Sequence, residues 1–193
     1  MSESIVRTRR WTRVEYERLV EQGVFQPGER IELLAGQLVI REPQTTPHAT
    51  GIRLVTRALR AVFTEDWWNV DMQLPVALDE ESEPEPDVAV TAGEPREFLA
   101  SHPRGPALVV EVAESSLGFD RKEKGSLYAR AQVPDYWIVN LRDHVLEVYR
   151  QPRRDSSEPH GWAYRSFQSL APGEHVTPVA APTARIAVAS LVP

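Results

Sequence analysis

Apolar residues recur every three to four positions in two stretches of the first third of this chain, which is the period of an amphipathic helix. The first stretch follows Thr12, whose hydroxyl can cap a helix while Glu15 completes a capping box, and Gly23 can end it. The second begins at Thr46-Pro47, because proline at the first helical position needs no N–H. We expect this second helix to run to Trp67-Trp68. Its inward face is predicted to carry His48, Ile52, Val55, Leu59 and Val62.

Short β-branched runs bounded by proline, glycine or polar residues predict strands in the rest of the chain. RIELLAGQLVIRE predicts a hairpin that turns at Ala35-Gly36, and PDVAV and PALVVEVA are typical of buried strands. Further strands are predicted in NVDMQLPVAL, QVPDYWIVN, HVLEVYR, WAYRSFQSL and ARIAVASLV. Helices interspersed with about seven to nine short strands indicate an α/β or α+β fold with a mixed sheet.

A third helix is predicted from Phe119 to Ala131, and it carries both lysines of the chain. Lys124 shares the inward face of this helix and Asp120 lies one turn earlier, whereas Lys122 is rotated away. The other 20 of the 22 basic residues are arginine. A lysine on the buried side of a helix needs a counter-charge or a chemical task.

The composition limits what this chain can be. Its 193 residues suit one domain, expected over 11–193 after a basic, flexible arm at 1–10. The chain has no cysteine, no run of about 18 apolar residues and no apolar leader, so we expect a cytoplasmic protein with no membrane span. The net charge of −6 argues against a non-specific DNA coater, but allows a nucleic-acid enzyme whose acidic site is offset by metal. The acidic segment DEESEPE is interpreted as a solvated connector.

Two carboxylates accompany apolar strand patterns, Asp87 in PDVAV and Glu111 in LVVEVA. If the two strands pair, these side chains lie side by side and can bind a hard cation such as Mg²⁺ or Mn²⁺. A nearby amine, for which Lys124 is the candidate, can orient or help deprotonate the attacking water and stabilise charge on the phosphorane. These three residue types are the minimum set for metal-assisted hydrolysis of a phosphodiester.

Other polar residues leave alternatives open. Glu32, in the first strand of the hairpin, lies either on a solvated face or toward a polar site. His48 is either a buried, hydrogen-bonded residue at a helix N-terminus or a functional one. A serine hydrolase that pairs Ser115 or Ser116 with His48 is disfavoured, since the chain has no G-x-S-x-G elbow.

In combination, PDVAV, LVVEVAESS and the segment from DRKEK to PDYWIVN resemble the Uma-type restriction endonuclease family, a domain long catalogued as of unknown function. That family belongs to the PD-(D/E)XK nuclease superfamily. RIELLAGQLV and PHATGIRLVTRAL are similar as well, so the resemblance extends from Trp11 to the C-terminus. It implies a restriction-endonuclease-like core, with a central mixed β-sheet flanked by helices and the site at one edge of the sheet.

The resemblance also implies roles for individual residues. Asp87 would be the motif aspartate and Glu111 the second metal ligand. The backbone carbonyl of Val112 would complete the metal shell, and Glu32 would add a contact to it. The supporting positions are His48 and Tyr128, together with Asp120 on the face of the third helix.

The sequence departs from the superfamily pattern at one point. The lysine expected two residues after Glu111 is Ala113, and Lys124 in the following helix takes its place. We therefore expect a Mg²⁺- or Mn²⁺-dependent endonuclease that hydrolyses phosphodiester bonds in DNA, with Asp87, Glu111 and Lys124 as catalytic residues. A homodimer is expected because exposed strands offer pairing edges. The alternative is a catalytically inactive nuclease-fold module that binds nucleic acid or protein partners, which the missing E-x-K lysine and the acidic charge favour.

Overall fold

The two most apolar strand patterns of the chain form the centre of its fold. In the computed structural model, which describes residues 8–41 and 43–193, β5 (Leu108–Ala113) and β6 (Asp135–Asn140) are buried along their whole length. They pair in parallel, and the other pairings of their sheet are antiparallel. The sheet therefore is the mixed sheet that the sequence predicts. Its six strands lie in the order β3 (Trp68–Asp71), β4 (Val88–Ala92), β5, β6, β7 (Val145–Arg154) and β8 (Trp162–Leu170).

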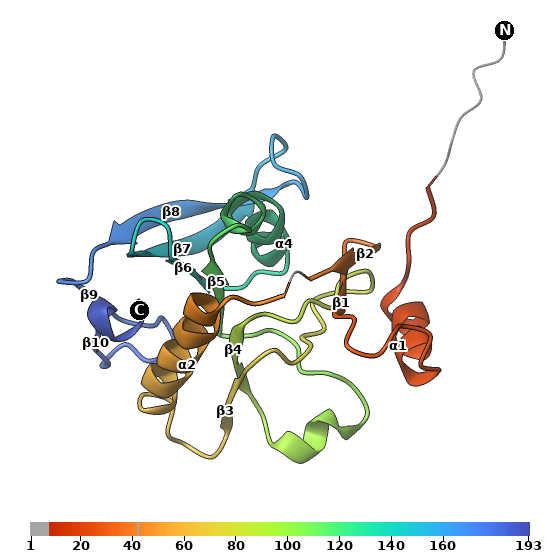
Figure 1. Cartoon of the computed structure of the whole chain (residues 1–193), viewed down its shortest axis with the longest axis horizontal. Coiled ribbons are helices and arrows are strands. Elements are labelled where there is room, and N and C mark those ends of the chain that lie inside the picture. Colours follow the sequence, from red (N-terminus) through yellow and green to blue (C-terminus); the bar gives the residue numbers. More distant parts are fainter. Residues whose placement is uncertain (1–7, 42) are drawn as a thin grey trace, which may run out of the picture.

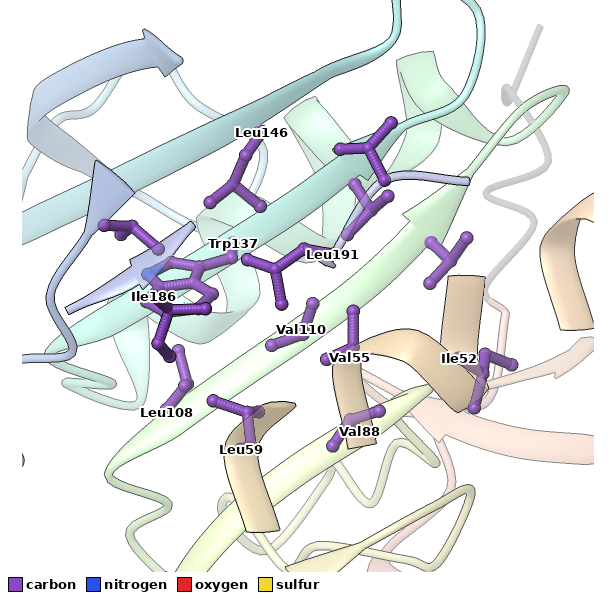
Figure 2. Close-up of a cluster of buried hydrophobic side chains, with 14 of the residues drawn as sticks. Ile52, Val55, Leu59, Val88, Leu108, Val110, Trp137, Leu146, Ile186 and Leu191 are labelled. Carbon is purple, nitrogen blue, oxygen red and sulfur yellow. The ribbon is translucent and has the colours of Figure 1, made fainter. Parts of the chain in front are cut away.

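Helices cover both faces of this sheet, and the strand period of two decides which side chains meet which helix. On one face α2 (Thr46–Arg60) packs its apolar stripe against the strands and the C-terminal segment, as Figure 2 shows for Ile52, Val55 and Leu59. A second buried cluster lies on the opposite face, under the helical segment that follows β5. Val88 and Val110 belong to the α2 face. By alternation, their neighbours Asp87 and Glu111 point to the other face.

A single helical segment makes the crossover that the parallel pairing of β5 with β6 requires. It consists of α3 (Leu117–Phe119), a π-helical turn (Asp120–Lys124) and α4 (Gly125–Arg130). The predicted third helix is thus confirmed, with a change of period inside it. Because π turns occur frequently at functional sites, this irregularity marks the segment as more than a connector.

A small hairpin lies beside the sheet, formed by β1 (Ile31–Leu34) and β2 (Gln37–Ile40) (Figure 1). Its turn residues Ala35 and Gly36 have φ values of 47° and 77°, the signature of a two-residue type I′ turn, as the sequence predicts. Glycine is required at the second position, because a Cβ there would lie 2.7 Å from the Cβ of Arg10.

The N-terminal helix α1 (Arg13–Glu21) lies on the same side of the sheet as the hairpin (Figure 1). The predicted capping box is formed, since Thr12 accepts from the backbone of Glu15 and the Glu15 carboxylate accepts from the backbone of Thr12. Residues 1–7 of the expected flexible arm lie outside the described residues. Arg10, from the rest of that arm, packs against the hairpin turn.

Short elements complete the fold. No helix among residues 8–41 and 43–193 is long and apolar enough to cross a membrane. The remaining elements are the 3₁₀ turns Pro95–Leu99 and Val188–Ser190 and the paired strands β9 (His175–Val176) and β10 (Ile186–Ala187).

The second helix and the strand after it are shorter than predicted. α2 ends at Arg60 because Phe63 turns back into the core. There its ring packs edge-on against the ring of Trp68, with 5.1 Å between the ring centroids. Trp68 opens β3 instead of closing the helix. The strand expected over NVDMQLPVAL stops at Asp71, since Gln73 has a φ of 53°, which extended backbone does not contain.

The interpretation of DEESEPE as a solvated connector is wrong. Ser82 and Glu83 are buried, because the segment runs alongside β1 and its Glu83 backbone N–H donates to the Leu33 carbonyl at 2.8 Å. The Glu83 carboxyl lies 3.8 Å from the Arg13 guanidinium. Burial, together with repulsion from Glu17, raises the pKa of Glu83 from its ordinary 4.5 to about 8.

This raised pKa predicts how stability depends on pH. The folded protein keeps a proton on Glu83 that the unfolded chain loses above pH 4.5, so stability falls as the pH rises from 4.5 to about 8. Glu83→Gln cannot ionise. We expect its free energy of unfolding to exceed that of the wild type by about 2 kcal/mol at pH 8, and the two to agree at pH 5.

Urea unfolding at the two pH values measures this difference. Glu80→Gln, at an exposed position of the same segment, is the matched control and is expected to follow the wild type at both. A wild-type advantage at pH 8 would contradict a protonated Glu83.

Candidate active site

Asp87 and Glu111 lie opposite each other where β4 begins and β5 approaches its end. The register pairs Val88 with Val110, and the backbone N–H of Asp87 donates to Glu111 Oε2 at 3.4 Å. Asp87 Oδ2 in turn accepts from the backbone N–H of Val112 at 2.9 Å. Both carboxylates are buried, and their predicted juxtaposition is what the strand pairing produces.

The residue before Asp87 explains why the two strands separate at this point. Extending the register of β4 and β5 by two residues brings Pro86 opposite Val112. Proline has no backbone N–H, so it cannot donate to the Val112 carbonyl as the ladder would require. The carboxylate of Asp87 takes over the Val112 N–H. The Pro–Asp pair thereby ends the ladder and leaves polar backbone available beside two carboxylates.

Lys124 reaches this pair from the π-helical turn. Its Nζ lies 3.0 Å from Glu111 Oε1 and 3.1 Å from Glu32 Oε1, and its side chain is only 4% exposed. Burial lowers the pKa of Lys124, but the carboxylates of Glu111, Glu32 and Asp120 outweigh it and raise that pKa above its usual range. Lys124 therefore stays charged.

Two further predicted residues meet at the same point. The hydroxyl of Tyr128 donates to Glu111 Oε1 at 2.7 Å from one turn further along the helical segment. Glu32, for which the sequence leaves two alternatives, points inward from β1, and its Oε2 accepts from the backbone N–H of Glu85 at 3.0 Å. Burial, which outweighs the attraction of Lys124, raises the pKa of Glu111 to about 7.

Asp87 accepts from three side chains besides the Val112 backbone. His48 Nε2 lies 3.2 Å from Oδ2, while Arg41 Nη2 at 2.7 Å and Gln73 Nε2 at 3.3 Å approach Oδ1. Although burial raises the pKa of Asp87, these donors lower it well below its usual range. His48 is thus hydrogen-bonded within the site, and the Asp87 carboxylate raises its pKa against the opposing effect of burial.

Asp120 lies at the edge of this group. It is buried and accepts from the hydroxyl of Ser116 at 2.6 Å, while burial raises its pKa. Because the Ser116 hydroxyl donates to Asp120 and the His48 Nε2 contacts Asp87, the serine hydrolase pair considered from the sequence is not formed by Ser116.

Most of the side chains described above line one cavity of about 420 Å³. Apolar residues form part of its wall, among them Ile40 and Phe119, which are exposed. Of the residues predicted for the site, Tyr128 alone is absent from the lining. It is fully buried in α4, and only its hydroxyl reaches Glu111. The predicted residues that line the cavity are Glu32, His48, Asp87, Glu111, Val112, Asp120 and Lys124.

The donor chemistry of the cavity suits a hard cation. Its candidate ligands are carboxylate oxygens and a backbone carbonyl, which Mg²⁺ and Mn²⁺ prefer. In the part of the chain that the structure describes, no three His, Asp or Glu side chains are already grouped for a metal ion. The reason lies in the contacts above, since Lys124 and Arg41 are hydrogen-bonded to the carboxylates that would bind one.

The sequence did not point to Arg41 or Gln73. Arg41 is one of 20 arginines and follows the hairpin strand without any distinguishing pattern. Gln73 belongs to a segment predicted as a strand, and its positive φ turns it toward the site. Both contact Asp87 only through tertiary structure.

The mixed sheet and its flanking helices form the core expected of a restriction-endonuclease-like protein. The chain belongs to the family described as "Uma2: Putative restriction endonuclease", whose model matches residues 13–186. The family and the fold support a nuclease, and the family implies a nucleic acid substrate.

A solved structure has the same fold. The chain is similar to a "putative nuclease belonging to DUF820" from Anabaena variabilis ATCC 29413, with a TM-score of 0.70 and 14% identity. The match covers 93% of this chain and 96% of the other, which confirms the restriction-endonuclease-like architecture. A search of curated proteins gave no match.

The buried position of Lys124 predicts a large effect of its removal. Lys124→Met leaves Glu32 and Glu111 buried without their cation, and we expect the free energy of unfolding at pH 8 to fall by about 3 kcal/mol. Burial raises the pKa of Glu111 to about 7, so in acid this carboxyl takes up a proton in the folded variant and the loss shrinks as the pH falls toward 5.

Urea unfolding of the purified variants at pH 8 and pH 5 tests this expectation. Lys122→Met removes the other lysine from an exposed position of the same π turn, and its unfolding is expected to change by less than about 0.5 kcal/mol. A loss for Lys124→Met that is the same at both pH values would show that the charge of Lys124 does not stabilise the two carboxylates.

Proposed function

We propose that this protein is a Mg²⁺- or Mn²⁺-dependent endonuclease that hydrolyses phosphodiester bonds in DNA. One observation carries the proposal. Asp87, Glu111 and Lys124 come from the start of β4, from β5 and from the π-helical turn, and they converge in one cavity. Buried charges are costly even when they are paired, and buried ionisable groups with perturbed pKa values cluster at functional sites.

Four groups would bind the metal ion. These are the carboxylates of Asp87 and Glu111, the backbone carbonyl of Val112 and, as a further contact, Glu32. A bound divalent cation supplies charge stabilisation at the phosphoryl oxygens and a more acidic water. The carbonyl of Val112 is available for this role because the residue across the ladder is Pro86.

The protonation state of Lys124 restricts what its amine does. A charged ammonium donates hydrogen bonds and cannot accept a proton. We therefore propose that Lys124 orients the attacking water and stabilises the negative charge that develops on the phosphate. Tyr128 and Glu32 position it, Tyr128 by orienting the Glu111 carboxylate and Glu32 by a second ion pair.

Two surface features of the protein support a DNA substrate and a homodimer. DNA is the substrate class that the restriction endonuclease family suggests, and Arg53 and Arg57 on the exposed side of α2 offer cations to its backbone. A homodimer is supported by β8, a nine-residue strand at the edge of the sheet, since edge strands are pairing surfaces.

One observation favours the alternative of a catalytically inactive module that binds nucleic acid or protein partners. Arg41 already pairs with Asp87, and Lys124 pairs with Glu111 and Glu32, so each carboxylate of the cluster has a cation of the chain itself as its partner. Metal affinity separates the two functions, because an inactive module has no need to bind Mg²⁺.

The test is cleavage of supercoiled plasmid and of single-stranded DNA with Mg²⁺ or Mn²⁺. We expect metal-dependent nicking by the wild type and a loss of about 100-fold or more in Asp87→Asn, which removes the charge and keeps the size of the side chain. Thermal melting shows whether this variant is folded.

Asp66→Asn is the matched control, because Asp66 is exposed in the loop between α2 and β3 and has no place in the cavity. It is expected to nick at the wild-type rate. No cleavage by the wild type with either metal, together with no metal binding by calorimetry, would favour the inactive module.

A further inference from the structure

Arg41, the first residue after β2, brings a guanidinium onto Asp87. Its Nη2 lies 2.7 Å from Asp87 Oδ1, and its Nη1 lies 2.5 Å from the carbonyl oxygen of Glu85. The side chain is 11% exposed and lines the cavity. The reaction proposed above gives this arginine no task.

The carboxylate of Asp87 has all of its acceptor positions filled. Oδ1 accepts from Arg41 and Gln73, and Oδ2 accepts from the Val112 backbone and His48. An ionised carboxylate has about four lone-pair positions. A metal ion that binds Asp87 must therefore displace one of these four donors.

Arg41 is the donor that a divalent ion at Asp87 repels most strongly. The N–H of Val112 is fixed by the backbone of β5, and Gln73 carries no charge. A guanidinium, in contrast, keeps its charge at every accessible pH. A doubly charged ion close to Asp87 repels that permanent charge, and the cavity gives the side chain space to move into.

The charges of the cavity lead to the same conclusion. Without Arg41, Asp87 would be buried with no permanently charged partner in the part of the chain that the structure describes, which is strongly unfavourable for a carboxylate. A divalent ion supplies that charge when Arg41 leaves. Among the described residues, the ionisable groups that share the cavity are the carboxyls of Glu32, Asp87, Glu111, Glu114 and Asp120, the imidazole of His48 and the cations Arg41 and Lys124.

We propose that Arg41 occupies the cation position at Asp87 in the metal-free protein and is displaced when the divalent ion binds. The inference rests on the proposed function and deepens it. In this proposal Arg41 sets the metal affinity of the site, and it stabilises the buried Asp87 carboxylate when no metal ion is bound.

Calorimetric titration of Mn²⁺ and Mg²⁺ into wild type and Arg41→Gln tests the proposal without reference to catalysis. Because the competing charge is gone, we expect the variant to bind Mn²⁺ at least about tenfold more tightly. We also expect it to melt below the wild type without metal and to gain more in melting temperature when Mn²⁺ is added.

Arg30→Gln is the matched control. Arg30 is the ladder neighbour of Arg41, whose backbone N–H donates to the Arg30 carbonyl, but its own guanidinium faces Glu85 Oε2 at 3.4 Å. The variant removes the same charge without freeing Asp87, so its metal affinity is expected to stay within about twofold of the wild type. Arg41→Lys, which keeps the charge and loses the two-pronged contact, is expected to have an intermediate affinity and serves if Arg41→Gln does not fold.

Two results would overturn the proposal. One is an Arg41→Gln variant, or in its place Arg41→Lys, that binds Mn²⁺ no more tightly than the wild type. The other is an equal gain in metal affinity in Arg30→Gln, which would show a long-range effect of charge instead of displacement.

If the wild type nicks DNA with metal while either result is found, the inference fails and the proposed function stands. If neither wild type nor variant binds metal and the wild type does not nick DNA, both fail.

Discussion

The burial of one ammonium group among carboxylates is the interaction on which the rest of this structure depends. Lys124 joins Glu111 of the central sheet to Glu32 of the hairpin, and each of the three is almost fully buried. Removing any partner would leave an uncompensated charge in a medium of low dielectric constant. The hairpin also meets α4 through an apolar cluster of Leu34, Ala35 and Leu127. Charge pairing and apolar contact therefore act together where the hairpin docks.

The same constraint explains why the site lies where a strand ladder ends. Inside a regular sheet the backbone N–H and C=O groups pair with each other and are unavailable to side chains or ligands. Pro86 interrupts the ladder between β4 and β5, and Asp87 then accepts the Val112 N–H that the ladder no longer uses. A Pro–Asp pair ahead of a buried strand thus places one acidic side chain and the end of the neighbouring strand beside the same cavity.

Much of this arrangement could be predicted from local patterns. The apolar runs of β4 and β5 predict that Asp87 and Glu111 lie together, and helical spacing predicts that Lys124 faces inward although the turn that carries it is π-helical. Local patterns fail where a contact joins distant segments. Nothing in DEESEPE signals that Glu83 pairs along β1, and Arg41 meets Asp87 across 46 residues of sequence. Such contacts are set by tertiary packing, which overrides the polarity of a segment.

The location of the acidic residues also changes what the net charge of −6 means. Among the described residues, seven of the 28 acidic side chains of the chain are buried, against two of its 22 basic ones. The acidic excess is therefore concentrated in the interior, where it consists of carboxylates paired with Lys124, arginines and backbone donors. Over residues 8–41 and 43–193, the charged side chains outside the interior are close to electrical balance, so a nucleic acid in contact with that surface meets acidic and basic groups in similar number. Four of these seven buried acidic residues, Glu32, Asp87, Glu111 and Asp120, line the cavity, so much of the acidity that would favour an inactive module belongs to the candidate metal site.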